Sequence, residues 1–240
     1  MKLDLLFIAA HPDDVELCSG GTILKHIQLG KKVGILDLTR GELGTRGTAQ
    51  TRDAEAKNAA QILGIHWREN LGFRDGFFVN DEYHRIKIIE KIREFTPEII
   101  ITNAYHDRHP DHGRASELVY DACFLAGLPK IKTNTKTGIQ QSFRPSLLLH
   151  FIQDNYIKPD FLIDITPYHE TKMAAIRAYT TQFFSAVANT TEPETYISNP
   201  VFLDTIIARS REFGKAINAT YAEGFLSKKL LGVDSFFDLR

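Results

Sequence analysis

Residues 3–14 read LDLLFIAAHPDD, and this stretch decides how the chain is expected to fold. Leu3–Ala10 is an almost continuous apolar run, typical of a strand buried on both faces. It ends abruptly in a polar turn, after which a helix is predicted from about Asp14 to Leu29, with Gly30 as its C-terminal stop. A buried strand that leads straight into a helix predicts the first unit of a parallel sheet covered by helices.

The same alternation continues along most of the chain. Further strands are predicted at residues 32–39, 65–70, 98–102, 146–152 and 161–165, and further helices at 51–63, 81–95, 113–126, from 167 and at 201–219. Without an internal repeat or a linker composition, this order predicts one α/β domain over residues 1–240. We expect a Rossmann-like, mainly parallel sheet between helices, with the active site at the carboxyl ends of its strands. Residues 128–144 are expected to form a surface loop and residues 185–200 a lid.

Composition excludes several classes of function. The 240 residues carry 29 Lys and Arg against 30 Asp and Glu, which argues against general binding to nucleic acid or to an anionic membrane. Two cysteines rule out both a four-cysteine metal site and a disulfide framework. The first apolar run is too short to span a membrane and is not followed by a small-residue cleavage site, so a cytoplasmic location is expected.

Histidine is the anomaly, because three of the nine histidines fall between residues 106 and 112. This group follows the predicted fourth strand, and His11-Pro12-Asp13-Asp14 follows the first, so both are expected at one edge of the sheet. A catalytic zinc needs three nitrogen or oxygen ligands and an open position for water. His11, Asp14 and His112 would supply them.

Each group also has an ordinary interpretation when taken alone. The two aspartates are typical of a helix N-cap, and clustered histidines are often merely solvated. Their expected meeting at one sheet edge favours the metal site. A dinucleotide site is excluded, because the first turn lacks the Gly-x-Gly-x-x-Gly pattern, and neither a Walker A loop nor a Gly-x-Ser-x-Gly elbow is present.

Five motifs together carry a resemblance to a known family. They are His11–Asp14, the Thr39–Glu42 loop with Gly44 and Gly47, Arg52, His109–His112 and Tyr221–Phe225. In this order they resemble the PIG-L/LmbE-like zinc-dependent N-acetylglucosamine deacetylases over nearly the whole chain.

The resemblance implies a hydrolase that releases acetate from a small acetylated amino sugar. It implies that His11, Asp14 and His112 hold Zn²⁺, with Fe²⁺ as an alternative native metal, that Asp13 is the general base and that His109 faces the reacting carbonyl. Within the family the chain is most similar to the bacillithiol-pathway deacetylases, which act on N-acetylglucosaminyl-malate. A homo-oligomer is expected on the same ground.

Other site residues keep two interpretations each. Asp111 either holds His109 in its protonated form or caps the following helix. Arg52 either binds a substrate hydroxyl or carboxylate or forms a surface ion pair with Asp53 or Glu55, and the resemblance favours substrate. Glu42 either contacts the sugar or faces water.

A tyrosine is a further open point. Some members of the family bring a tyrosine from the C-terminal part into the site. Phe202 stands where that residue is expected, and Tyr196 is a nearby candidate.

Three other functions remain to be weighed. The first is deacetylation of a different N-acetylglucosamine compound, such as a chitooligosaccharide or another glycoside. The second is a non-haem iron oxygenase, whose metal triad is also two histidines and a carboxylate, but it would leave Asp13 without a role. The third is a non-catalytic metal- or sugar-binding module, which would be expected to lack Asp13 or His109.

Overall fold

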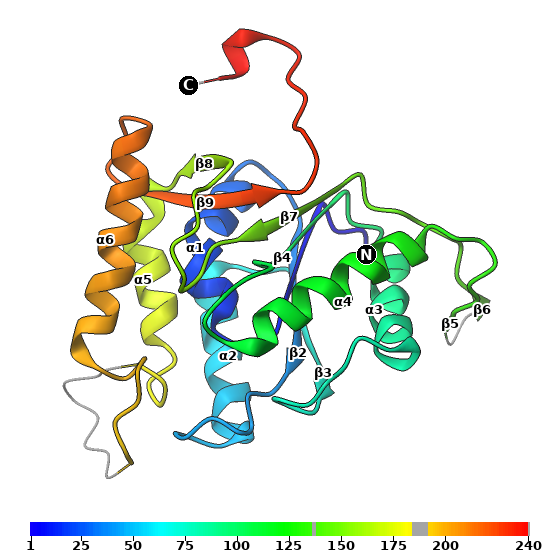
Figure 1. Cartoon of the computed structure of the whole chain (residues 1–240), viewed down its shortest axis with the longest axis horizontal. Helices are drawn as coiled ribbons and strands as arrows, with labels where there is room; N and C mark the ends of the chain where they lie inside the picture. The colour runs from blue at the N-terminus through cyan, green and yellow to red at the C-terminus, as the bar shows by residue number, and fades with distance from the viewer. Residues whose placement is uncertain (136–137, 184–191, 240) are drawn as a thin grey trace.

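A central sheet organises the computed structural model, which describes residues 1–135, 138–183 and 192–239 (Figure 1). Its seven strands run in the order β3-β2-β1-β4-β7-β9-β8. They are β1 (Leu5–Ala9), β2 (Val33–Thr39), β3 (Trp67–Phe73), β4 (Ile99–Asn103), β7 (Leu147–Phe151), β8 (Phe161–Asp164) and β9 (Ala222–Ser227). Strands β3, β2, β1, β4 and β7 pair in parallel with their neighbours in this set, whereas β9 is antiparallel to both β7 and β8. The predicted mainly parallel α/β fold is confirmed.

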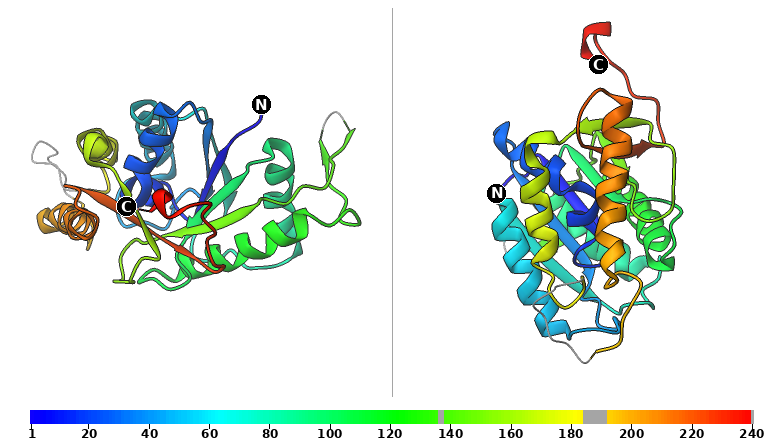
Figure 2. Two further views of the ribbon diagram at one scale, coloured as in Figure 1. Left: turned by 90° about the horizontal axis from the view of Figure 1, so that it is seen from above. Right: turned by 90° about the vertical axis from the view of Figure 1, so that its left-hand side faces the viewer.

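Helices cover both faces of this sheet (Figure 2). One face packs against α1 (Asp14–Gln28), α2 (Ala49–Leu63), α5 (His169–Arg177) and α6 (Pro200–Ala216). The other face packs against α3 (Glu82–Phe95) and α4 (Pro110–Ala126). All five residues of β1 are buried, which agrees with its unbroken apolar sequence. No helix of the described residues is long and apolar enough to cross a membrane.

The chain reverses direction across the sheet at β1. From β1 it continues through α1 to β2 and β3 on one side, and then returns through α3 to β4 on the other side of β1. The carboxyl ends of β1 and β4 therefore flank a topological switch point, where sheets of this kind bind ligands. The two polar groups singled out in the sequence follow these two strands.

Helix α4 begins three residues earlier than its predicted start at residue 113, and this difference changes how the site is built. Pro110 occupies the first turn, where a missing N–H costs nothing, and His109 is the N-cap. The ring Nδ1 of His109 accepts a hydrogen bond from the backbone N–H of Asp111 at 3.3 Å. Asp111 and His112 thus lie on a rigid helix instead of a loop.

Two other predicted segments differ from the structure. Strand β9 lies beyond the last helix, predicted at 201–219, where the sequence predicts no strand. Residues 128–144 contain a two-stranded ribbon, β5 (Asn134–Thr135) with β6 (Gly138–Ile139). Residues 185–191 of the predicted lid lie outside the described residues.

Candidate active site

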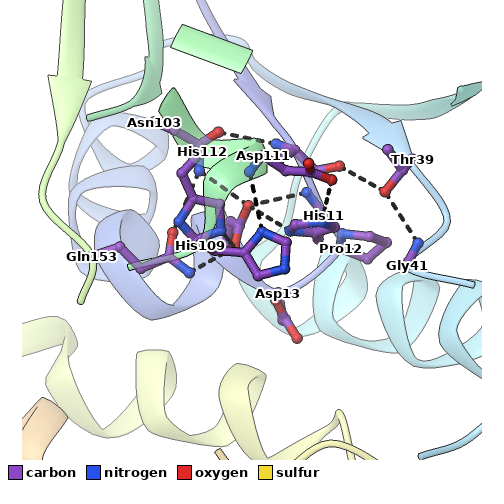
Figure 3. Close-up of polar contacts among 12 residues, drawn as sticks. His11, Pro12, Asp13, Thr39, Gly41, Asn103, His109, Asp111, His112 and Gln153 are labelled. Atoms are coloured by element: carbon purple, nitrogen blue, oxygen red, sulfur yellow. Dashed lines mark hydrogen bonds and ion pairs between the residues drawn. The ribbon is translucent and has the colours of Figure 1, made fainter. Parts of the chain in front are cut away.

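The predicted metal ligands meet at the switch point. The Nδ1 of His11 lies 3.6 Å from Oδ2 of Asp14, and the Nε2 of His112 lies 3.2 Å from Oδ1 of the same carboxylate. All three residues are buried. His11, His109 and His112 also each offer a nitrogen within 4.8 Å of the others, and Figure 3 shows the three rings together. The structure therefore gathers the predicted trio and places His109 beside it.

The carboxylate of Asp14 is fixed by donors from three strand ends. Its Oδ2 accepts from the backbone N–H of His11 at 3.0 Å and from Nδ2 of Asn103 at 3.1 Å. Its Oδ1 accepts from Nε2 of Gln153 at 2.6 Å. Asn103 ends β4 and Gln153 follows β7, so both come from the sheet edge where ligands bind. The sequence interpretation did not include either residue.

His112 has a partner that the sequence interpretation also missed. Its Nδ1 lies 2.6 Å from Oδ2 of Asp107. The other oxygen of Asp107 accepts backbone N–H groups from Arg108, Asp154 and Asn155 at 2.8, 3.1 and 2.8 Å. A carboxylate held in this way fixes the ring plane and the proton on Nδ1, so that Nε2 is the nitrogen available to a metal. Burial opposes the charged ring, but the carboxylates of Asp14 and Asp107 raise the pKa of His112 to about 9, so a metal at Nε2 would displace a proton.

His11 has a second carboxylate environment at its other nitrogen. Its Nε2 lies 3.0 Å from Oδ1 of Asp75, which follows β3, and 3.4 Å from Oδ2 of Asp111. Because His11, Asp75 and Asp111 also group within 4.8 Å of one another, they form a second possible ligand set. Asp75 is a further site residue that the sequence interpretation missed.

Asp13 is held in an unusual conformation beside the cluster. Its φ of 101° lies in the left-handed region, which is costly for a residue other than glycine and is concentrated at functional sites. Its Oδ2 accepts from Nη2 of Arg52 at 3.0 Å, and both side chains are buried. Burial raises the pKa of Asp13 to about 7, while the Arg52 guanidinium opposes that rise. Asp13 is therefore a carboxylate poised between its two protonation states.

Arg52 holds the Asp13 turn and also lines the cavity described below. Besides Asp13, its guanidinium donates to the carbonyls of Pro12 at 2.5 Å and Gly41 at 3.3 Å. A Cβ on Gly41 would lie 2.1 Å from Nη1 of Arg52, so this position needs glycine. Arg52 is buried, and it is paired with neither Asp53 nor Glu55. Both terminal nitrogens are engaged by the protein, whereas Nε has no hydrogen-bond partner among the described residues, so substrate binding by Arg52 stays a prediction.

The described hydrogen bonds and ion pairs of the Asp111 carboxylate are with groups other than His109. Its carboxylate accepts the N–H of Gly76 at 2.8 Å and pairs with Arg114. Among the described contacts, His109 makes one hydrogen bond, to the backbone N–H of Asp111, and its ring centroid lies 4.7 and 5.2 Å from those of His11 and His112. Burial, together with the nearby His11 and His112, lowers the pKa of His109 to about 4. This shift favours the neutral imidazole, and the hydrogen bond that Nδ1 accepts from Asp111 assigns the remaining proton to Nε2.

Glu42 belongs to the support of the site. It is exposed, and its Oε1 accepts the N–H of Asp75 at 2.8 Å. It does not line the cavity described below. Of its two expected roles, facing water is the one that the structure favours.

A cavity of about 470 Å³ opens in front of these residues. His11, Asp13, Asp14, His109 and His112 line it, together with Arg46, Arg52, Arg108, Gln182, Tyr196 and Phe202.

Tyr196 and Phe202 therefore both reach the cavity. The hydroxyl of Tyr196 donates to Oδ1 of Asp154 at 2.9 Å, and Arg108 lies over the Tyr196 ring at 4.4 Å from its centroid. Among the described residues, none from the predicted surface loop at 128–144 lines this cavity.

Comparison with known proteins gives consistent matches. Residues 6–123 match the family model described as GlcNAc-PI de-N-acetylase. The chain is 30% identical to diacetylchitobiose deacetylase of Thermococcus kodakarensis, over 92% of this chain and 81% of that protein. It is 29% identical to a probable N-acetyl-alpha-D-glucosaminyl L-malate deacetylase of Bacillus anthracis, over 76% of this chain and 83% of that protein.

A solved structure extends this similarity to the whole fold. The crystal structure of the conserved protein TT1542 from Thermus thermophilus superposes with a TM-score of 0.85 at 36% identity. The match covers 96% of this chain and 97% of that one.

Proposed function

The chain belongs to the PIG-L family, and from this membership and the site geometry we propose that it is a metal-dependent hydrolase that removes the N-acetyl group from an N-acetylglucosamine derivative. The observation that carries the proposal is the position of Asp13. A buried carboxylate with a pKa raised to about 7 lines the same cavity as a cluster of two imidazoles and a second carboxylate. A general base is most effective when its pKa is near the operating pH.

We assign the metal to His11, Asp14 and His112. Two imidazole nitrogens and one carboxylate oxygen form a donor set of the kind that catalytic zinc uses, and the partners of Asp14 and His112 hold both in orientations suited to binding. When bound, such a metal would polarise the amide carbonyl and lower the pKa of a bound water. Zn²⁺ is our choice, with Fe²⁺ as the alternative.

Asp13 would move the protons of the reaction. Arg52 occupies Oδ2, which leaves Oδ1 free to take a proton from the attacking water. The same carboxyl group would later give the proton to the nitrogen of the departing amine. Because the left-handed backbone conformation and Arg52 fix this side chain, little reorganisation is needed at either step.

His109 would stabilise the oxyanion as a neutral donor. Its Nδ1 accepts from the N–H of Asp111, so the proton lies on Nε2, which is available to a carbonyl oxygen in the cavity. Removing a donor of this kind costs about 2.7–4 kcal/mol of transition-state stabilisation. In this proposal His109 therefore acts in its neutral form, without a proton held by Asp111.

For the substrate we favour N-acetylglucosaminyl-malate. Arg52 lines the cavity, as do Arg46 and Arg108, which pair with Glu192 and Asp154. They would suit a carboxylate-bearing aglycone. Diacetylchitobiose is the second candidate, because the relative that acts on it is as similar as the malate-type relative.

Measuring acetate release tests both the deacetylase activity and the choice of substrate. The metal-loaded chain is supplied with N-acetylglucosaminyl-malate, diacetylchitobiose and N-acetylglucosamine in parallel. Fastest release from the malate compound supports the finer assignment, and fastest release from diacetylchitobiose replaces it. Lack of release from all three refutes the deacetylase proposal.

Two variants separate the roles of the residues. Asp13→Asn is expected to keep the metal and lose most turnover, whereas His112→Ala is expected to lose both. Asp121→Asn, on the outer part of α4, is the control. Loss of metal from Asp13→Asn would show that the division between base and ligand is wrong.

A further inference from the structure

The segment after β9 lies apart from the rest of the molecule. Residues 228–239, here called the C-terminal arm, leave the sheet and extend beyond its edge, as the red trace shows in Figures 1 and 2. Six of its side chains are large, apolar and between 40% and 98% exposed: Leu230, Leu231, Val233, Phe236, Phe237 and Leu239. A solvated tail is poor in such residues, and contiguous exposed apolar surface marks an interaction site.

The tip of the arm is ordered by its own hydrogen bonds. Asp238 accepts from the N–H groups of Asp234 and Ser235 at 3.1 and 2.9 Å, and Ser235 caps a 3₁₀ turn by accepting from the N–H of Phe237 at 3.1 Å. The hydrogen bonds described for residues 230–239 all join residues of this segment. The turn therefore presents Phe236 and Phe237, 89% and 98% exposed, without any packing against the body.

An exposed aromatic face lies at the root of the arm. Tyr120 and Phe124 are four residues apart on α4, so they share one side of the helix, and they are 47% and 55% exposed. The Nζ of Lys228, in the arm's first residue, lies 4.2 Å from the centroid of the Tyr120 ring, and Arg144 lies 4.4 Å from that of Phe124. These cations complement the carboxylates of Asp234 and Asp238 on the arm.

We infer that the C-terminal arm binds the Tyr120–Phe124 face of a second copy of this chain, and that the two copies exchange arms about a two-fold axis near the arm roots. A two-fold contact is self-complementary, so one chain must carry both the arm and the receiving face, as this chain does. The ten residues 230–239 span up to about 33 Å when extended, which is enough to cross to a partner.

The area involved is sufficient for a stable dimer. Two phenylalanine side chains bury about 300 Å² when covered, and the surface beneath them loses a similar area. Two exchanged arms therefore remove about 1,200 Å² from water, which reaches the range of specific interfaces before the leucines are counted.

Sedimentation equilibrium of the full chain over a range of concentrations tests the inference. The unmodified chain is expected to show the mass of a dimer or a multiple of it. Phe236→Ser with Phe237→Ser is expected to raise the dissociation constant about 30-fold or more. Tyr156→Ser, which changes a side chain that is 70% exposed elsewhere, is the matched control and should leave the mass unchanged.

Disulfide trapping distinguishes exchange from folding back. Both native thiols are buried, so a Phe124→Cys, Phe237→Cys double variant carries two new accessible cysteines. Oxidation is expected to give covalently linked dimers. A disulfide within one chain would overturn the inference, as would a single-chain mass at every concentration or a dimer that survives loss of both phenylalanines.

Discussion

Replacing Asp107 by asparagine is expected to weaken metal binding although Asp107 is not one of the assigned ligands. One oxygen of Asp107 accepts three backbone N–H groups, and the other faces Nδ1 of His112 at 2.6 Å. Asparagine has a single side-chain oxygen, and we expect it to face the three backbone N–H groups, because they are fixed in place and need an acceptor. Its NH₂ group then faces His112.

The consequence is a change of tautomer. An NH₂ group at that place would make Nδ1 an acceptor and move the imidazole proton to Nε2, the nitrogen 3.2 Å from Asp14. A protonated Nε2 cannot bind a metal. Loss of an orienting partner typically lowers metal affinity 10–100-fold. Because the wrong tautomer is also favoured, we expect the affinity of this variant to fall about 100-fold, which corresponds to about 2.7 kcal/mol.

Zinc affinity measured by competition with a chromophoric chelator is the direct assay, with acetate release measured on the same samples. Asp121→Asn, the same chemical change outside the site, should bind zinc as the unmodified chain does. Unchanged zinc affinity in Asp107→Asn would refute both the tautomer argument and the role of His112 as a ligand.

Three further changes test an ion pair at the site and two contacts elsewhere in the fold. Arg52→Met leaves Asp13 buried without its ion partner, so the free energy of unfolding in urea should fall by about 3–5 kcal/mol, and an unchanged midpoint would contradict the pair. Gly21→Ala brings a Cβ to 2.6 Å from Cβ of Ile165 and should cost about 1–3 kcal/mol in the same assay. Arg93→Leu removes the donor to three backbone carbonyls at and beyond the end of α4. The midpoint of thermal unfolding should fall. An equal or higher midpoint would show that these hydrogen bonds do not stabilise the fold.

The sheet could be predicted because its central strands have a clear sequence signal. Strands such as β1 are buried on both faces, so apolar runs mark them, and polar residues mark their carboxyl ends. Strand β9 gives no such signal, because Glu223 lies inside it. That carboxylate is buried against the N–H groups of Gly21 and Thr22 and against Lys172, partners that are distant in the sequence.

The location of the site could be predicted from the sequence, whereas most of the hydrogen bonds between its side chains could not. His11, Asp14 and His112 could be grouped because each follows a strand, and the same rule would have found Asp75 after β3 and Asp107 after β4. What the sequence does not contain is the pairing of side chains across loops. The pairing of Arg52 with Asp13 depends on Gly41 letting the guanidinium approach, and this cannot be read from the spacing of residues.

Metal-dependent release of acetate is the direct test of whether this chain is a metal-dependent deacetylase. The chain is stripped of metal with a chelator, returned to chelator-free buffer, and assayed with N-acetylglucosaminyl-malate and diacetylchitobiose before and after addition of stoichiometric Zn²⁺ or Fe²⁺. We expect no release from the stripped chain and restored release after one metal is added. Equal release before and after addition, or none from either sugar under any condition, would contradict this expectation.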